Sequence, residues 1–224
     1  MKTLCWLHSE VNQLSGYGGV ESGGGEKTTE EVGAIATTSP GKGTATPAQA
    51  DLLCSFANTL DVDADAAAPD ALTDAAALTD WLRQRDLLDV DDRADSGDLD
   101  LALRLRSGLR EAMLRHHEGD HTSRVPDLDA AATALPLRIV FDGTRPRLAP
   151  AVGGARGGLA RLLVAVADAQ ADDAWVRLKL CVADDCQWAF YDTSKNRSRH
   201  WCSMGVCGNR QKTRSYRARQ RAKS

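Results

Sequence analysis

The sequence contains few aromatic residues and no long apolar run. Phe, Trp and Tyr together make up 5% of its 224 residues. No stretch of eighteen apolar residues occurs, which excludes an ordinary transmembrane helix. The N-terminus lacks an apolar core followed by small residues, so we expect no signal peptide and a cytoplasmic protein that does not engage membranes.

Acidic residues are missing from the end of the chain. After Asp192 there are ten lysines and arginines and no Asp or Glu. From Arg177 onward the net charge is +9, whereas residues 1–176 carry −12, and the whole-chain charge of −3 hides this difference. A basic segment without compensating acids indicates a polyanionic partner, and nucleic acid is the polyanion that we favour.

Cysteine is also scarce outside the C-terminal part of the chain. Cys5 and Cys54 stand alone, which excludes a secreted disulfide framework. The other four form two pairs with four intervening residues in each, namely Cys181, Cys186, Cys202 and Cys207. Two tight thiolate pairs satisfy the tetrahedral geometry of Zn²⁺, so we predict a structural zinc site.

Two alternatives to this zinc site remain open. The cysteines could form a redox-active dithiol pair or remain as buried thiols without a metal. His200 lies two residues before Cys202 and could replace one sulfur ligand.

Aromatic and polar residues lie between the two cysteine pairs. We expect the aromatic side chains to form the core of a small zinc ribbon, although they could instead stack on bases. They are Trp188, Phe190, Tyr191 and Trp201. Asp192 is expected to cap a turn or to pair with an arginine rather than to perform acid–base chemistry.

The rest of the chain has the pattern of a mainly helical domain with one small β-hairpin. Residues 1–48 are rich in glycine and poor in large apolar groups, so we predict a disordered extension. Apolar residues at helical spacing then indicate a helical domain over residues 49–176, with a hairpin at 137–148 around Asp142-Gly143. The expected helices cover residues 51–60, 69–85, 98–117, 126–134 and 159–171. Three arginines of the longest helix are expected to lie on its solvated surface: Arg104, Arg106 and Arg110.

Residues 210–223 have the pattern of a basic helix appended to the cysteine module. Asn209 is the expected N-cap. No apolar stripe is present, and an isolated helix of this length is marginal in water, so we expect it to become ordered against phosphates. The candidate phosphate contacts are Arg197, Arg199, Arg210, Arg214, Arg217 and Arg221.

Two strings resemble catalytic motifs without their context. Residues 117–121, His-Glu-Gly-Asp-His, match the metalloprotease pattern HExxH, but Gly119-Asp120 falls where the long helix should end and the flanks have solvent-like composition. Gly153–Gly158 lacks the Lys-Ser/Thr of a phosphate-binding loop. We find no nucleophile–base pair and expect no enzymatic activity.

The flanks of the cysteines are similar to a known family. Cys207-Gly208-Asn209-Arg210, preceded by Trp201-Cys202-Ser203-Met204, resembles the CGNR zinc finger, and the segment from Cys181 to Ser194 has the pattern of its first half. Phe56–Leu60 and the two helices that follow are similar to the ABATE domain that usually precedes this finger. The long Gly-rich N-terminus departs from the family pattern, as does His200, where the family usually has a second arginine.

This resemblance spans residues 50–220 and implies a bacterial, stress-related transcription regulator whose four cysteines bind zinc. Residues 177–224 are then the finger and its basic tail. We therefore expect a zinc-dependent nucleic-acid-binding protein, with DNA favoured over RNA, whose helical domain senses a signal or forms a homo-oligomer. Two alternatives are an RNA-binding ribbon and a protein interaction module whose tail docks on an acidic partner, such as the chain's own residues 61–100.

Overall fold

The structure is a computed structural model that describes residues 46–63, 69–141, 143 and 145–222. The predicted disordered extension, residues 1–48, lies almost entirely outside this range, and so does Asp142 of the predicted hairpin turn. Within the described ranges, no helix has both the length and the apolar character needed to cross a bilayer.

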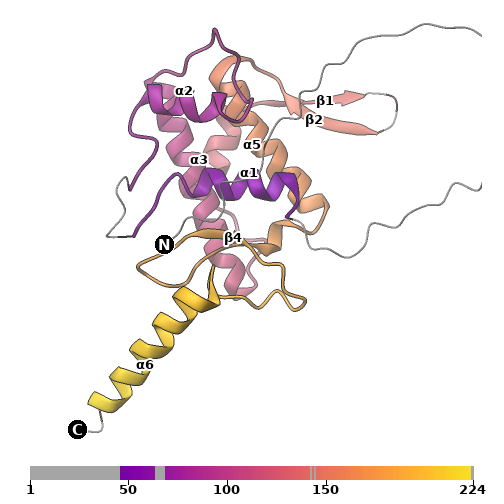
Figure 1. The fold of residues 1–224 in the computed structure, drawn as a ribbon. Coiled ribbons are helices and arrows are strands. Elements are labelled where there is room, and N and C mark those ends of the chain that lie inside the picture. The colour runs from indigo at the N-terminus through magenta and orange to yellow at the C-terminus, as the bar shows by residue number, and fades with distance from the viewer. Residues whose placement is uncertain (1–45, 64–68, 142, 144, 223–224) are drawn as a thin grey trace, which may run out of the picture. The chain divides into compact units, whose positions relative to one another are not determined.

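Five helices build the first part of the fold, which is mainly helical as predicted (Figure 1). The two longest are α3 (Ser96–Arg115) and α5 (Gly154–Ala171), and α1 (Ala48–Ala57) packs against both. The shorter helices α2 (Ala75–Arg83) and α4 (Pro126–Ala134) lie against α3. Leucine and alanine dominate the core between them, which explains how the domain folds with few aromatic residues.

The predicted β-hairpin is present between α4 and α5. Strands β1 (Leu137–Phe141) and β2 (Pro146–Pro150) are antiparallel, with Ile139 opposite Leu148. β2 lies against α5, and a short turn then leads into that helix.

Side-chain caps set two helix starts. The Asp74 carboxylate accepts a hydrogen bond from the Ala77 N–H, so α2 begins at Ala75 rather than at the predicted Pro69-Asp70. Asp95 and Asp98 form a reciprocal capping box at the start of α3.

Glycines set the start of α5, which begins five residues before the predicted Leu159. A Cβ atom added at Gly157 or Gly158 would lie 2.6 Å from the carbonyl oxygen of Val152 or Leu87, respectively. The first turns of the helix can therefore approach neighbouring backbone only because these positions lack side chains.

Two arginines that were predicted to be solvated are buried instead. Arg106 donates two hydrogen bonds of 2.7 Å to the Asp70 carboxylate and a third to Thr59. Arg110 donates to the carbonyls of Ala57 and Leu60, just where α1 ends. Carbonyls at the end of a helix lack intrahelical partners, and a guanidinium can satisfy several of them at once, which explains the burial of Arg110, whereas Arg106 is buried against the Asp70 carboxylate. Only Arg104 is exposed.

Gly108 marks the closest approach of α3 and α4, and replacing it with alanine is expected to destabilise the domain. A Cβ atom there would lie 2.5 Å from the Leu128 backbone nitrogen, so the helices must move apart. The expected cost is about 1–3 kcal/mol, measured as a lower urea midpoint of the zinc-loaded protein. Ser107→Ala, on the exposed side of the same helix, serves as the control and should leave the midpoint unchanged. Equal midpoints for the two variants would contradict the close crossing.

A second two-stranded sheet continues the core into the C-terminal module. Strands β3 (Leu178–Leu180) and β4 (Ala189–Tyr191) are antiparallel and pack on α3 and α1, respectively. The Asn58 side chain accepts a hydrogen bond from the Ala189 N–H (2.7 Å) and donates one to the Ala189 carbonyl (3.0 Å). The amide of Asn58 thus bonds to β4 as a neighbouring strand would.

Candidate metal centre and basic helix

The four predicted cysteines converge into one cluster. Their sulfur atoms all lie within 4.8 Å of one another, and Sγ of Cys202 lies 3.7 Å from Sγ of both Cys186 and Cys207. A tetrahedron with metal–sulfur bonds of about 2.3 Å has sulfur–sulfur edges of about 3.8 Å. Among the described residues this is the only group of three or more His, Cys, Asp or Glu side chains placed to hold a metal ion.

The charge balance of the cluster also fits a bound cation. A hydrogen bond from the Cys186 thiol lowers the pKa of Cys181, whereas the bond that Cys202 makes to Cys181 raises the pKa of Cys202. Without a cation, a thiolate at Cys181 therefore disfavours a second thiolate at Cys202. A divalent cation removes this repulsion and allows all four sulfurs to bind as thiolates.

Local hydrogen bonds shape the two cysteine turns. Cys181 directly follows β3, and its N–H donates to the Trp188 carbonyl at 2.9 Å. The second turn is one turn of π-helix, η3 (Met204–Gly208), whose N-terminus is capped by the Ser203 hydroxyl. α6 (Asn209–Arg221) continues η3 directly.

The predicted N-cap at Asn209 is therefore wrong, because η3 already places this residue in helical geometry. The residues after Cys207 instead support the cluster. A side chain at Gly208 would require the Met204 side chain to move, and the Asn209 amide donates to the Gly205 carbonyl. Arg210 donates to Sγ of Cys207 at 3.7 Å, which stabilises a thiolate at that position. Gly208, Asn209 and Arg210 thus support the turn that carries Cys207, through close packing, a hydrogen bond and a nearby positive charge.

A buried ion pair closes the loop between the cysteine pairs. Lys179 lies 3.0 Å from the Asp192 carboxylate, and the two side chains are 4% and 0% exposed. Asp192 also accepts hydrogen bonds from the backbone and hydroxyl of Ser194 and from the Arg199 N–H. Burial opposes the charge, but the bonds from Ser194 and Lys179 outweigh it and lower the pKa of Asp192 to about 2. Asp192 caps the turn as predicted, although its charged partner is a lysine rather than an arginine.

The aromatic side chains of the module pack inward. Phe190 is buried, and the Arg199 guanidinium lies over its ring at 5.1 Å. Trp188 and Trp201 pack on the cysteine cluster. The ring of His200 stacks on His117 at 5.4 Å rather than joining the sulfur atoms.

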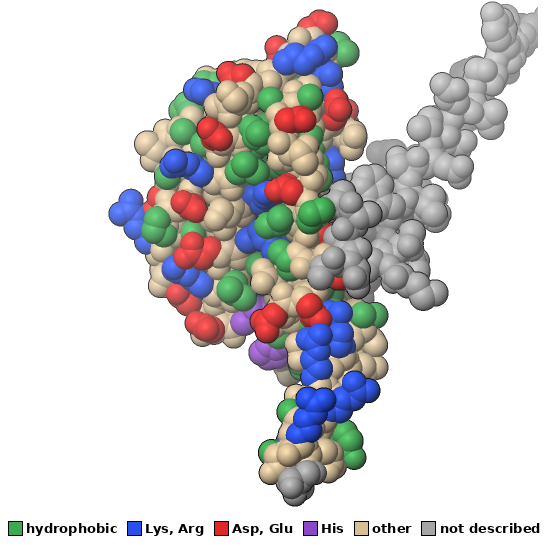
Figure 2. All heavy atoms as spheres, turned by 90° about the vertical axis from the view of Figure 1, so that its left-hand side faces the viewer, with side chains coloured by type: hydrophobic (Ala, Val, Ile, Leu, Met, Phe, Trp, Pro, Cys, Tyr) green, Lys and Arg blue, Asp and Glu red, His purple; other side chains and the backbone are tan. Residues whose placement is uncertain are grey.

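α6 carries most of the predicted phosphate contacts, and none of its thirteen residues is buried. Figure 2 shows basic side chains lined up along this helix, with acidic side chains at its upper end. The predicted contacts are not equivalent, however. Arg210 and Arg214 both pair with Asp185, at 3.0 and 2.6 Å, and Arg199 donates to the Cys202 carbonyl at 2.6 Å.

Asp185 was not singled out in the sequence, although a signal was present. Asp184-Asp185 is the only acidic pair in the basic C-terminal part of the chain, and it lies between two metal ligands. By pairing with Arg210 and Arg214, Asp185 sets the direction in which α6 leaves the metal centre.

Replacing Asp185 with asparagine is expected to strengthen non-specific binding of polyanions. The change removes the ion pairs of Arg214 and Arg210 with Asp185. The slope of the logarithm of duplex DNA affinity against the logarithm of salt concentration should therefore become more negative by about 1–2 units. Fluorescence anisotropy over a salt series measures this slope. Asp184→Asn changes the net charge equally at an exposed residue that pairs with neither arginine in the described structure, and should leave the slope unchanged. Equal effects of the two variants would contradict the ion-pair interpretation.

The HExxH string does not form a metal site. α3 ends at Arg115, and Gly119 adopts a left-handed φ of 76°, so the two histidines do not share a helix face. His117 donates to the Leu180 carbonyl at 2.5 Å. The flanks are less solvated than expected, because His116 is buried and bonded to the Leu178 carbonyl, and burial lowers its pKa to about 4.

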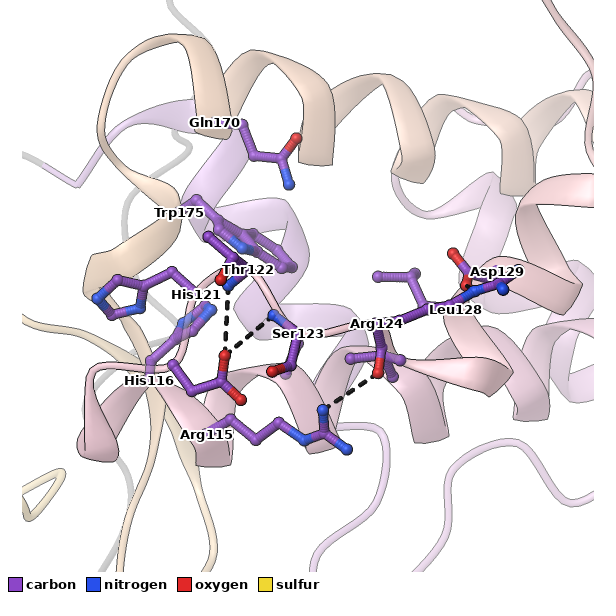
Figure 3. Close-up of a pocket in the computed structure, with 13 residues that line it drawn as sticks. Arg115, His116, His121, Thr122, Ser123, Arg124, Leu128, Asp129, Gln170 and Trp175 are labelled. Atoms are coloured by element: carbon purple, nitrogen blue, oxygen red, sulfur yellow. Dashed lines mark hydrogen bonds and ion pairs between the residues drawn. The ribbon is translucent and has the colours of Figure 1, made fainter.

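An open pocket of about 370 Å³ lies beside this string (Figure 3). It is lined by the ends of α3 and α5, the loop between α3 and α4, the start of α4, and Trp175 of the short 3-10 helix η2 (Trp175–Arg177). Arg124 pairs with Asp129 and Arg115 with Glu111, while the Asp120 carboxylate accepts hydrogen bonds from the Thr122 and Ser123 N–H groups.

The fold and site together define a helical domain followed by a four-cysteine zinc-finger module and a basic helix. Comparison with protein families agrees. The ABATE family model, described as a putative stress-induced transcription regulator, matches residues 50–175, and the CGNR zinc finger model matches residues 177–220. The chain belongs to the ABATE family and carries a CGNR zinc finger, as the resemblance in the sequence implied. No match to a curated protein was found.

Proposed function

We propose that the protein is a cytoplasmic transcription regulator that binds DNA through its zinc finger and basic helix. The observation that carries this proposal is α6, an exposed basic helix that contains no acid and continues directly from the second cysteine turn. A helix with this charge gains stability against a phosphate backbone.

The bound metal is proposed to be Zn²⁺, held by Cys181, Cys186, Cys202 and Cys207. Four thiolates with the observed sulfur spacing are the usual ligands of structural zinc. Because protein sulfurs fill all four positions, the metal stabilises the finger and offers no open position for catalysis. We therefore assign no enzymatic role to the centre.

The predicted phosphate contacts divide into two groups. Arg199 and Arg210 support the finger, since they donate to a carbonyl and to a thiolate in the second cysteine turn. Arg197, Arg217 and Arg221 are exposed, and we assign them direct contacts with phosphates. Arg214 joins them when DNA displaces Asp185.

Salt dependence tests this function. If the zinc-loaded protein neutralises about five phosphates, the logarithm of its affinity for duplex DNA should fall with the logarithm of salt concentration at a slope of about −4 to −5. Sequencing of co-purified nucleic acid identifies the bound species. Binding of DNA and RNA that is absent or independent of salt would refute the proposal.

The pairing of Asp185 with two arginines also supports a second function, in which the basic helix docks on carboxylates of an acidic protein. Treatment of affinity-purified complexes with nuclease distinguishes the two. Partners that remain bound after complete nucleic-acid digestion favour the protein interaction module.

A further inference from the structure

α6 carries an uncharged polar stripe in addition to its arginines. We propose that α6 is a recognition helix that lies in the major groove of B-form DNA and contacts base edges through this stripe. The stripe consists of Asn209, Thr213, Tyr216 and Gln220. The inference rests on the function proposed above and specifies its substrate as double-stranded DNA.

The spacing of the stripe places its members on one face of the helix. They stand at positions i, i+4, i+7 and i+11, which at about 100° per residue fall within an arc of about 60°. All four side chains are exposed, and Tyr216 is 58% exposed. The Asn209 amide donates to the Gly205 carbonyl and the Thr213 hydroxyl donates to the Asn209 carbonyl, but both side chains keep further donors or acceptors. With Tyr216 and Gln220 they give this face uncharged hydrogen-bonding groups, as contact with base edges requires.

Cations flank the stripe on both sides. Helical geometry places Arg214, Arg217 and Arg221 along one side of it, and Lys212 and Arg219 along the other. A helix in the major groove lies between two phosphate backbones, and these two rows correspond to them.

The opposite face of α6 is also uncharged, but it is partly covered where the helix begins. It consists of Gln211, Ser215 and Ala218, and Gln211 is partly covered where the helix leaves the metal centre, whereas Asn209 and Thr213 are exposed there. The stripe therefore points away from the finger at the beginning of α6, where a duplex can approach it.

The dimensions favour DNA over double-stranded RNA. α6 is thirteen residues long, about 20 Å at 1.5 Å per residue. The B-DNA major groove is about 12 Å wide and accepts a helix. The major groove of A-form RNA is too narrow and deep for one. Asn and Gln pair with adenine, and Thr contacts thymine, so the preferred site should contain A·T base pairs.

A matched pair of double variants tests the stripe. The preferred duplex is first selected from a random library with the zinc-loaded full-length protein. Thr213→Ala/Gln220→Ala removes one hydroxyl and one amide from the stripe, and Ser215→Ala/Gln211→Ala removes the same groups from the opposite face. Neither changes the charge, and alanine favours the helix, so loss of α6 does not confound the comparison.

We expect the stripe variant to lose about 10- to 100-fold of the preference for the selected over a scrambled duplex, while its salt slope stays unchanged. The control should retain the full preference. Suppose that the wild-type protein binds DNA with a steep salt slope, but the stripe variant keeps its preference or RNA duplexes bind equally well. The proposal that α6 is a recognition helix is then wrong, while the proposed function stands. Absence of salt-dependent binding to any nucleic acid would refute both.

Discussion

Replacing Cys202 and Cys207 together with serine is expected to abolish zinc binding and to disorder α6. Only two sulfur ligands remain in this variant. The free energy of zinc binding to small structural sites is about 10–16 kcal/mol at neutral pH, and in such modules it is largely the free energy of folding. The core around the sulfurs consists of the four cysteines, Ala183 and two tryptophans, which is too small to fold without the metal.

The loss should be confined to one part of the finger. β3 and β4 are held by the helical domain through Asn58 and His116, so they should stay protected from hydrogen exchange. α6 loses the turn that anchors it and should exchange rapidly, since an isolated helix of this length is unstable. DNA affinity should fall by at least 100-fold, because the arginines lose their common direction.

Metal analysis and hydrogen-exchange mass spectrometry measure this outcome. The wild type should contain about one zinc per chain, and the double variant none. Cys54→Ser, in α1 and outside the cluster, is the control and should keep the metal. A wild type without zinc, or a double variant that retains zinc and DNA affinity, would refute the four-ligand centre.

Replacing Asp192 with asparagine is expected to destabilise the protein by about 3–5 kcal/mol, the usual cost of breaking a buried ion pair on one side. The Lys179 ammonium is 4% exposed and would retain the Arg197 carbonyl but lose its charged partner. Lys179→Met should cost less, because Asp192 would keep its bonds to Ser194 and to the Arg199 N–H.

Urea unfolding of the zinc-loaded variants at neutral pH measures this order. The exposed pair between Arg124 and Asp129 supplies the control, and Asp129→Asn should leave the midpoint unchanged. Because Asp192 ionises with a pKa of about 2 when folded and near 3.8 when unfolded, the pair contributes its full stability above about pH 4 and loses it as the pH falls toward 2. If Lys179→Met destabilised more than Asp192→Asn, the order proposed for these partners would be wrong.

The cysteine turns, the helices and the hairpin could be predicted from the sequence, because each depends mainly on residues close together in the chain. The cysteine spacing predicted that the four sulfur atoms converge, as they do, because such turns are short and their geometry is local. The periodicity of apolar residues located the helices, and Asp142-Gly143 located the hairpin. Local capping also explains the errors at helix starts, since Asp74 and Ser203 were competing caps that a single sequence does not rank.

Contacts between distant segments could not be predicted. Arg106 meets Asp70, and Asp185 meets Arg214, across 36 and 29 residues. An arginine in a charged helix has the same pattern whether it is solvated or buried against a carboxylate, because the partner is set by tertiary packing. The distinction between supporting and exposed arginines in the finger is of the same kind, and it emerged only from the folded chain.

The bonds between the helical domain and the finger have an evolutionary consequence. Asn58 bonds to the backbone of Ala189, and His116 and His117 bond to the carbonyls of Leu178 and Leu180. Every residue type offers the same backbone groups, proline nitrogen excepted, so these hydrogen bonds do not depend on side-chain identity, whereas most side chains of β3 and β4 are constrained by burial in the core. Exposed side chains elsewhere in the finger can therefore change while these backbone bonds to the helical domain are kept.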